Sequence, residues 1–477
     1  MSIEILVNEG LGETRAAILD QGILQEIHIE RAAKRGFVGN LYKGRVARVL
    51  PGMQAAFIDI GLERTGFLHA ADIATPAEDI RKLLNAGDEI LVQVVKDPLG
   101  TKGARLTTFV SLASRYLVYT PRGNGIGVSL RIEDEIERGR LKDLVGALSD
   151  EQLSGGYIIR TAAHGATLGA LREDMIYLTK LWEHIGNRFR EVQGFGCVHA
   201  DLPLALRILR DELSASVERV LVDSPAAWAR MREFAEEFIA DGAARIHLYE
   251  GPRALLELHD IEGEIDHALE RKVQLKSGGH LVFDQTESMT TIDVNTGAYV
   301  GHRNLEETIF RTNLEAAVAV ARQLRLRNLG GIIIIDFIDM HDEAHRREVL
   351  SALEHGLAGD RVQTHIANLS PLGLVEMTRK RVRESLEHLL CRTCPACEGR
   401  GFVKSVETTC QEIFREILRQ GRQFASRELL ILAHQEVVDR LLEEAASMAE
   451  LEAKVARPIR LQVEGLYEVD RFDVVLI

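Results

Sequence analysis

The sequence contains little proline, little cysteine and no long hydrophobic run. Ten prolines in 477 residues, without any tract of glycine and serine, argue against long flexible linkers. The longest apolar stretch is residues 316–321, whereas a transmembrane helix needs about 20 such residues, so we expect no membrane-spanning segment. Glu4 and Glu9 lie in and beside the first apolar stretch, which a secretory signal would not tolerate. We therefore expect a soluble, cytoplasmic protein.

The spacing of the cysteines and the balance of charged residues exclude further classes of protein. Three of the five cysteines are crowded between residues 391 and 397, which favours a metal site or reduced thiols over a disulfide framework. Lysine and arginine count 58 against 72 aspartates and glutamates, a net charge of -14. This balance disfavours a protein that coats nucleic acid indiscriminately, but it permits local basic grooves. The content of 46% hydrophobic and 27% charged residues excludes disordered and fibrous chains.

The pattern of apolar residues predicts several α/β domains, and the length alone suggests roughly three. Residues 1–35 alternate in short apolar runs separated by glycines, which is typical of a β-meander. Residues 39–108 carry five short predicted strands with glycine and proline at the turns, which suits a small closed barrel of the OB type. Strands and helices mix after residue 109. From residue 278 their alternation predicts an α/β layer, which a small α/β tail follows.

Two aspartates stand where predicted strands end, Asp293 in TTIDVNTG and Asp336 in IIIIDFIDM. Four isoleucines predict a fully buried strand before Asp336, so its carboxylate must lie at the strand mouth, be paired, or bind a cation. With the amide of Asn295, the two carboxylates are suited to holding one Mg²⁺ for phosphodiester hydrolysis. The alternative is a helix cap or an ion-paired structural aspartate. Asp339 is left out, because strand spacing turns it away from Asp336.

The predicted barrel offers two aromatic residues beside a basic turn. Phe57 and Phe67 lie on it, with Lys102 and Arg105 at the glycine-rich turn DPLGTKGARL. Rings that stack on bases, flanked by cations that meet the backbone, are typical of single-stranded nucleic-acid binding on this fold. Each phenylalanine taken singly is more often part of a core. The two features together favour a binding surface.

A cysteine knuckle follows the α/β layer. Cys394 and Cys397 in CPAC supply two thiolates, whereas zinc binds four ligands in a tetrahedron. No second Cys-x-x-Cys pair occurs in the sequence. Three interpretations stay open: a second chain donates its own pair, Cys391 and a non-cysteine ligand complete the site, or the pair is a reduced surface dithiol without metal.

Two further features concern phosphate. Arg160 and Thr161 end the stretch GGYIIRTAA, and a guanidinium beside a hydroxyl is suited to a terminal phosphate. An Arg-Thr pair alone is more often a solvated edge. The basic runs 322–328 and 378–383 are either ordinary solvated helix faces or a track for a nucleic-acid backbone.

Long blocks of the sequence resemble the ribonuclease E/G family, from the first predicted strand to the last. The blocks are GNLYKGRVARVLPGMQAAFIDIGLERTGFLHA, VVKDPLGTKGARLTT, KSGGHLVFDQTESMTTIDVNTGAYVG, LRLRNLGGIIIIDFIDM, LGLVEMTRKR and CPACEGRG. One branch of the family continues into a long disordered scaffold. The present chain stops at Ile477, soon after the small tail, so it is similar to the shorter branch.

The resemblance implies an α/β multidomain fold in which domains are inserted into one another. The implied parts are an RNase H-like subdomain split between 1–35 and 205–268, an S1-type OB-fold barrel at 36–108, a 5′-sensor domain at 109–204, a DNase I-like catalytic subdomain at 269–390, a zinc link at 391–404 and a small α/β domain at 405–477.

The resemblance also implies a role for individual side chains. It places the magnesium aspartates at Asp293 and Asp336 and the phosphate-contacting asparagine at Asn295. It places the RNA-binding positions of the barrel at Phe57, Phe67 and Lys102, and the pocket for a 5′-monophosphate at Arg160 and Thr161, with Val118 on its wall. The cysteines that share one zinc between two protomers would be Cys394 and Cys397. Two residues depart from the family pattern. Ser114 stands where part of the family has a pocket glycine, and Cys391 is an extra thiol.

The implied activity is that of a magnesium-dependent endoribonuclease. It would cut single-stranded RNA to 5′-phosphate and 3′-hydroxyl ends, with stimulation by a 5′-monophosphate on the substrate, and would act in the 5′-end maturation of ribosomal RNA and in mRNA decay. Its implied partners are these RNAs and a second copy of the chain, and no membrane is implied.

Two other classes of protein remain possible from the sequence. A non-catalytic RNA chaperone or ribosome-associated factor would need the barrel but not both aspartates, and a DnaJ-like zinc module would need more copies of the cysteine motif.

Overall fold

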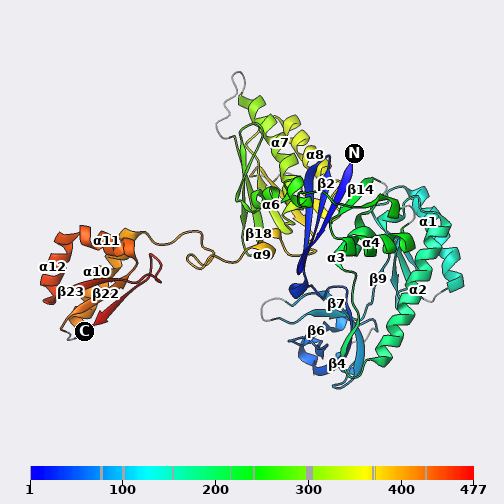
Figure 1. Ribbon diagram of the computed structural model, residues 1–477, viewed down its shortest axis with the longest axis horizontal. Helices are drawn as coiled ribbons and strands as arrows, with labels where there is room; N and C mark the ends of the chain where they lie inside the picture. The colour runs from blue at the N-terminus through cyan, green and yellow to red at the C-terminus, as the bar shows by residue number, and fades with distance from the viewer. Residues whose placement is uncertain are drawn as a thin grey trace. The chain divides into compact units, whose positions relative to one another are not determined.

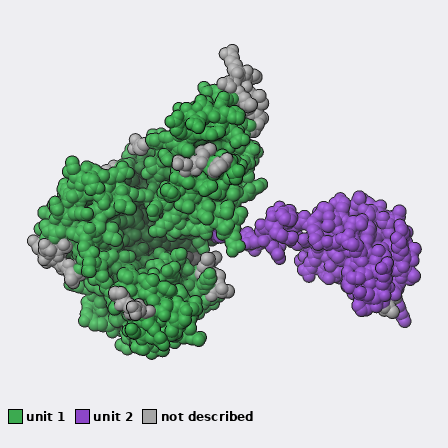
Figure 2. Space-filling model, turned by 180° about the vertical axis from the view of Figure 1, so that it is seen from behind, with its two compact units in different colours: residues 1–386 green, residues 387–477 purple. Residues whose placement is uncertain are grey.

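The computed structural model describes residues 2–75, 79–98, 102–152, 155–214, 216–239, 242–296, 305–367, 370, 372–424 and 427–477 (Figure 1). The chain divides into two compact units, residues 1–386 and 387–477 (Figure 2). Among the helices of these described ranges, none combines the length and the apolar content that crossing a membrane requires.

The first sheet combines two segments that lie far apart in the sequence. Its strands, in the order β15-β14-β1-β2-β3, are Ile246–Leu248, Val217–Val222, Ile3–Glu9, Glu13–Asp20 and Ile23–Arg31. The predicted meander is confirmed as β1 to β3, and β1 pairs in parallel with β14. The accompanying helices are α3 (Leu204–Glu212), α4 (Pro225–Phe238), α5 (Leu255–Leu258) and α6 (Ile261–Leu269). Apolar residues of α3 and α4 spaced at helical intervals, such as Ile208 and Met231, are buried with this sheet.

The predicted barrel is confirmed as a closed ring of five strands. They are β4 (Leu41–Leu50), β5 (Ala55–Asp59), β6 (Gly66–His69), β8 (Arg105–Thr107) and β7 (Glu89–Lys96), and β7 pairs back with β4. Alternation puts Val46, Ile58 and Leu106 inside the barrel. The interior is tight, because a Cβ atom added at Gly66 would lie 2.5 Å from Leu106 Cδ1. Strand β13 (Gly196–His199) extends the sheet beside β4.

A smaller sheet follows the barrel in the sequence. Its strands, in the order β11-β12-β10-β9, are Ile126–Val128, Gly156–Ile159, Leu117–Thr120 and Leu112–Ala113. The helices α1 (Glu135–Gln152) and α2 (Leu168–Glu191) share its core. Tyr119 and Tyr157 are buried there, with ring centroids 5.2 Å apart.

The third sheet carries the two predicted aspartates. Its order is β16-β17-β18-β19-β21-β20, with bounds Lys272–Gln274, His280–Gln285, Met289–Asn295, Gly331–Asp336, Leu374–Arg379 and Thr364–Ile366. The helices α7 (Leu305–Leu326) and α8 (Glu343–Leu357) lie side by side and share its core (Figure 1). The predicted alternation of strand and helix is therefore present.

The prediction of a fully buried strand at residues 332–335 is wrong. Ile333 and Ile335 are buried in the core with α7 and α8, whereas Ile332 is 47% exposed and Ile334 is half-buried. One face of β19 meets the helices and the other remains open, so four identical residues alternate between two environments. The aspartate that follows them is therefore exposed as well.

A second expectation also fails, because the predicted helix over residues 379–390 is shorter. Only Leu386–Leu390 (α9) is helical, since Arg379 still belongs to β21. The carbonyls of Arg383 and Glu384 accept hydrogen bonds from Asn328 Nδ2 at 3.1 and 2.9 Å. Asn328 itself follows α7 with φ at 49°, a left-handed conformation in which a helix commonly ends.

The second unit contains the cysteine motif and a small α/β fold, as predicted. A three-stranded sheet in the order β23-β22-β24 is formed by Ile459–Val463, Leu429–Ala433 and Phe472–Leu476. Its helices are α10 (Val406–Gln423), α11 (Gln435–Glu443) and α12 (Ala445–Val455). Ile413 and Ile417 of α10 are buried against Leu429 and Ile431 of the central strand.

Candidate functional site

Asp293 and Asp336 lie directly opposite each other on two hydrogen-bonded strands. β18 and β19 are parallel, and their register pairs Asp293 with Asp336. Ile292 and Val294 are buried on either side of Asp293, so alternation directs this carboxylate to the open face of the sheet. Asn295 is two residues further along, and its Nδ2 donates to Asp293 Oδ2 at 2.8 Å. The structure therefore brings the three predicted residues together.

Partial burial and neighbouring carboxylates both affect the pKa of Asp336. Desolvation raises the pKa of Asp336 above its usual range, and the nearby carboxylates of Asp293 and Asp339 raise it further. Asp339 therefore lies near enough to affect the pKa of Asp336, although the sequence analysis left it out of the site. β19 ends at Asp336, so strand alternation does not govern Asp339. Within the described ranges, no three side chains of His, Cys, Asp or Glu gather as a metal-binding group.

The outer surface of the barrel carries a row of four side chains on four neighbouring strands. Phe57 of β5 is paired with Phe67 of β6, and their rings meet edge to face with centroids 6.0 Å apart. The register continues to Arg48 of β4 on one side and to Arg105 of β8 on the other. Both phenylalanines are half-buried, and both arginines are exposed. The aromatic pair is therefore partly exposed on the barrel, with an arginine at each end of the row.

Arg48 was missed by the sequence reasoning. A register shift between Val46 and Arg48 brings Arg48 opposite Phe57, and nothing in the local pattern predicts such a bulge. Arg105 is held by Asp72, with Nη2 3.0 Å from Oδ2. The predicted Lys102 is exposed and precedes β8.

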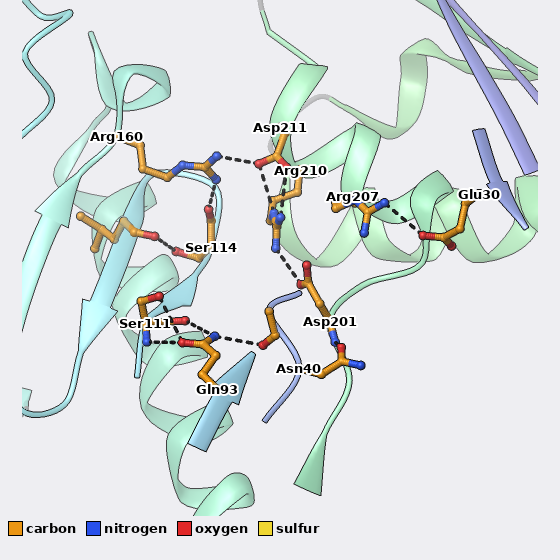
Figure 3. Close-up of polar contacts among 12 residues, drawn as sticks. Glu30, Asn40, Gln93, Ser111, Ser114, Arg160, Asp201, Arg207, Arg210 and Asp211 are labelled. Atoms are coloured by element: carbon orange, nitrogen blue, oxygen red, sulfur yellow. Dashed lines mark hydrogen bonds and ion pairs between the residues drawn. The ribbon is translucent and has the colours of Figure 1, made fainter. Parts of the chain in front are cut away.

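The predicted phosphate residues belong to the two inner strands of the smaller sheet, since Arg160 and Thr161 follow β12 and Val118 lies on β10. Arg160 is already engaged by other groups of the chain (Figure 3). Its Nη1 donates to the Ser114 carbonyl at 2.5 Å, and its Nη2 donates to Asp211 Oδ1 at 2.6 Å. Thr161 is exposed, with its hydroxyl 2.9 Å from that of Ser129. Val118 is half-buried on β10 opposite Ile158. Asp211 comes from α3, distant in the sequence, so no local signal could reveal it.

Arginines of the two basic runs form hydrogen bonds and ion pairs with other parts of the chain. Arg322 donates to the Leu24 carbonyl at 2.9 Å, and Arg325 pairs with Glu26 at 2.9 Å. These contacts connect α7 with β3. In the second run, Arg379 is buried in an ion pair with Asp360 at 2.7 Å. The interpretation as a track for a nucleic-acid backbone is therefore wrong for these three arginines.

The predicted zinc cysteines lie in a tight turn of the second unit. Cys394 is exposed and Cys397 is half-buried. Backbone N–H groups of Gly401 and Gly399 bond to the sulfur of Cys397, and together with Cys394 they lower the pKa of its thiol. Glu398 and Gly399 have φ of 51° and 86°, which wraps the backbone around this sulfur. Cys391 is exposed and does not complete a larger group among the described residues.

Comparisons with known proteins agree with these features. The sequence matches the model of the "Ribonuclease E/G family" over residues 111–382, of the "S1 RNA binding domain" over 36–108 and of the "RNase E/G, Thioredoxin-like domain" over 393–475. It is 54% identical to proteins named Ribonuclease G from Salmonella typhimurium and Escherichia coli K12, over the full length of each chain. It is 37% identical to Ribonuclease E of Escherichia coli K12, over 91% of this chain and 42% of that protein.

The chain belongs to the ribonuclease E/G family. Its closed barrel is an S1 domain, and the small α/β domain predicted at the C-terminal end is thioredoxin-like.

Proposed function

We propose that the chain is a magnesium-dependent endoribonuclease that hydrolyses single-stranded RNA to 5′-phosphate and 3′-hydroxyl ends. As a member of the ribonuclease E/G family it is an endoribonuclease, and its S1 domain binds RNA. The metal, the strand preference and the product ends are inferred from the site. The observation that carries them is the pairing of Asp293 with Asp336 on the open face of the sheet.

The residues at this site fit a magnesium ion. Mg²⁺ prefers oxygen ligands and usually binds through one or two carboxylates together with water and substrate phosphate. Asp293 and Asp336 supply two carboxylates that lie opposite each other on the paired strands. Desolvation, and after it the nearby carboxylates of Asp293 and Asp339, raise the pKa of Asp336. When bound there, the ion polarises a phosphodiester and makes water a stronger nucleophile at neutral pH. Attack by water rather than by a ribose hydroxyl leaves the 5′-phosphate and 3′-hydroxyl ends.

Asn295 has a separate task from the two aspartates. Its Nδ2 group fixes the orientation of Asp293 through the bond at 2.8 Å. Holding a ligating carboxylate in one orientation reduces the cost of organising the site when metal and substrate bind. The exposure of Asp293 and Asp336 leaves the face accessible to a single strand.

The S1 barrel supplies the main RNA-binding surface in this proposal. Two bases stack on Phe57 and Phe67, and the exposed Arg48 and Arg105 meet the phosphates at either end of the row. Lys102 adds a further cation near β8. Because Arg105 is shared with Asp72, Arg48 is the cation with more of its charge available for RNA.

Replacing Arg48 with alanine is expected to weaken binding of single-stranded RNA and to flatten its salt dependence. One lost phosphate contact should reduce the slope of log affinity against log salt by about 0.7. Fluorescence anisotropy at several salt concentrations measures this slope. Arg81→Ala is the matched control, since Arg81 is an exposed barrel arginine in an ion pair with Asp79 at 2.6 Å. An Arg48 variant with an unchanged slope would remove Arg48 from the RNA-binding surface.

The proposal includes a sensor for the 5′ end of the substrate. Arg160 and Thr161 bind a 5′-monophosphate, beside a wall that contains Val118. In support, Arg160 uses two of its N–H groups within the chain and retains others, and the Thr161 hydroxyl is exposed beside Ser129. A monophosphate carries about two negative charges and several acceptor oxygens, which suit a guanidinium and a hydroxyl.

The domain assignment follows the same proposal. We assign residues 1–35 and 205–268 to an RNase H-like subdomain, 109–204 to the 5′-sensor, 269–390 to a DNase I-like catalytic subdomain, 391–404 to a zinc link and 405–477 to the small domain. Two chains share one zinc ion through Cys394 and Cys397. The RNAs cut by such an enzyme include precursors of ribosomal RNA and mRNA.

One assay tests the metal and the sensor together. Two short single strands that differ only in a 5′-monophosphate or a 5′-hydroxyl are incubated with the purified chain, with EDTA or with added Mg²⁺. Cleavage is expected only with Mg²⁺, and kcat/KM should be about ten- to a hundredfold higher for the phosphorylated strand. Cleavage that survives chelation would overturn the metal assignment, and equal rates would overturn the sensor.

A further inference from the structure

Arg160 has a resident counter-ion inside the chain. Its Nη2 lies 2.6 Å from Asp211 Oδ1, and its Nη1 donates to the Ser114 carbonyl at 2.5 Å (Figure 3). Only 27% of the Arg160 side chain and 25% of the Asp211 side chain are exposed. An ion pair that is largely removed from water is screened less than a surface pair. A phosphate that binds Arg160 therefore binds a guanidinium that already forms an ion pair with the carboxylate of Asp211.

Asp211 is itself held firmly. Arg210 Nε donates to its Oδ1 at 3.2 Å and Arg210 Nη2 to its Oδ2 at 3.0 Å, while Arg210 Nη1 also reaches Asp201 at 3.2 Å. Burial raises the pKa of Asp211, but Arg210 and Arg160 outweigh burial and lower it below the usual range. The carboxylate is therefore charged at neutral pH. Figure 3 shows the resulting row of alternating charges, Arg160, Asp211, Arg210 and Asp201.

The pair formed by Arg160 and Asp211 carries no net charge, which has a consequence for anion binding. A 5′-phosphate brings about two negative charges to a guanidinium whose charge Asp211 already compensates. It shares Arg160 with Asp211, and like charges on one guanidinium repel each other. The repulsion grows with the charge of the RNA end, so a triphosphate is penalised more than a monophosphate. A 5′-hydroxyl end is not penalised.

We propose that Asp211 is the specificity-determining residue of the 5′-sensor, because its carboxylate competes with the RNA end for Arg160 and grades RNA ends by charge. This inference rests on the proposed binding of a 5′-monophosphate at Arg160. Asp211 acts through Arg160 and does not touch the reacting atoms.

The backbone of Asp211 is anchored independently of its side chain. Arg361 donates to the Asp211 carbonyl, and Arg361 Nη2 also pairs with Glu212 at 3.0 Å. Substitution of the carboxylate leaves these bonds in place. Asp211→Asn also retains the shape and an oxygen that accepts from Arg160. It removes the charge together with the acceptor of Arg210 Nη2.

The test compares three versions of one short single strand, with a 5′-hydroxyl, a 5′-monophosphate or a 5′-triphosphate. In Asp211→Asn, the ratio of kcat/KM for monophosphate to that for hydroxyl should rise on the order of tenfold, which corresponds to about 1.4 kcal/mol. The ratio for triphosphate to hydroxyl should rise further. Each ratio is taken with one protein preparation, so the fraction of active protein cancels. Asp201→Asn is the matched control, since Asp201 contacts Arg210 but not Arg160, and it should leave both ratios unchanged.

A double-mutant cycle links the effect to Arg160. Arg160→Ala should abolish the monophosphate preference, and adding Asp211→Asn to it should change nothing. An unchanged or lower monophosphate ratio in Asp211→Asn, or an equal gain in the Arg160→Ala background, would overturn the inference. Asp211→Ser repeats the measurement if the asparagine variant does not fold. A wild-type chain with no monophosphate preference would instead refute the proposed sensor, whereas a wild-type preference that Asp211→Asn leaves unaltered refutes only the role of Asp211.

Discussion

Replacing Asp293 or Asp336 with asparagine is expected to slow RNA cleavage by about a thousandfold or more. The two carboxylates are paired across β18 and β19 and are the only acidic residues that the register brings directly opposite each other among the described pairs of these strands. An amide has the same shape but lacks the negative charge, so each variant loses half of the anionic ligand set for Mg²⁺. The loss should appear in single-turnover cleavage of a short 5′-monophosphorylated strand.

RNA affinity should change little in these variants, because the aromatic and cationic row lies on the S1 barrel. Asp284→Asn is the matched control. Asp284 lies on the neighbouring strand β17, and Arg271 pairs with it at 2.5 Å, so its charge is already compensated. The control should cleave at close to the wild-type rate. A variant of Asp293 or Asp336 that keeps about a tenth of wild-type turnover would exclude that residue from the metal site.

Much of the fold could be predicted because burial imposes a period on the sequence. Short alternating runs between glycines gave the meander β1–β3 and the five-stranded barrel, and both are present. Burial of a single strand was harder to predict. Four consecutive isoleucines contain no alternation, so the sequence could not show that helices cover only one face of β19.

The aspartates of the site were predictable because Asp336 ends β19 and Asp293 lies two residues before the end of the neighbouring strand β18. Arg48 and Asp211 were not. Arg48 reaches the aromatic row through a register shift, and Asp211 reaches Arg160 from a helix that belongs to another part of the same unit. The prediction that the basic runs contact a nucleic-acid backbone was wrong for the same reason, since Arg325 and Arg379 form ion pairs with carboxylates that are remote in sequence. Contacts set by tertiary structure leave no local pattern.

The Cys-x-x-Cys motif of the second unit leads to a prediction about zinc content and oligomeric state. Cys394 and Cys397 provide two thiolates, and the described residues add no third ligand to them, whereas structural zinc takes four. The N–H groups of Gly401 and Gly399 favour the ionised form of Cys397, which is the form that binds zinc. A pair from each of two chains would complete the tetrahedron without any other residue, so we expect zinc binding and dimerisation to occur as one event.

Replacing Cys394 or Cys397 with serine is therefore expected to release the zinc and to convert a dimer into monomers. Metal analysis of the unmodified protein should find about one zinc for two chains, since each chain supplies half of the four ligands. Light scattering coupled to gel filtration reports the mass before and after substitution. Cys391→Ser is the control, because Cys391 is exposed and joins no larger group among the described residues, and it should retain both zinc and dimer. One zinc in each monomeric chain would show instead that the site is completed within a single chain, and loss of zinc in Cys391→Ser would identify this thiol as the missing ligand.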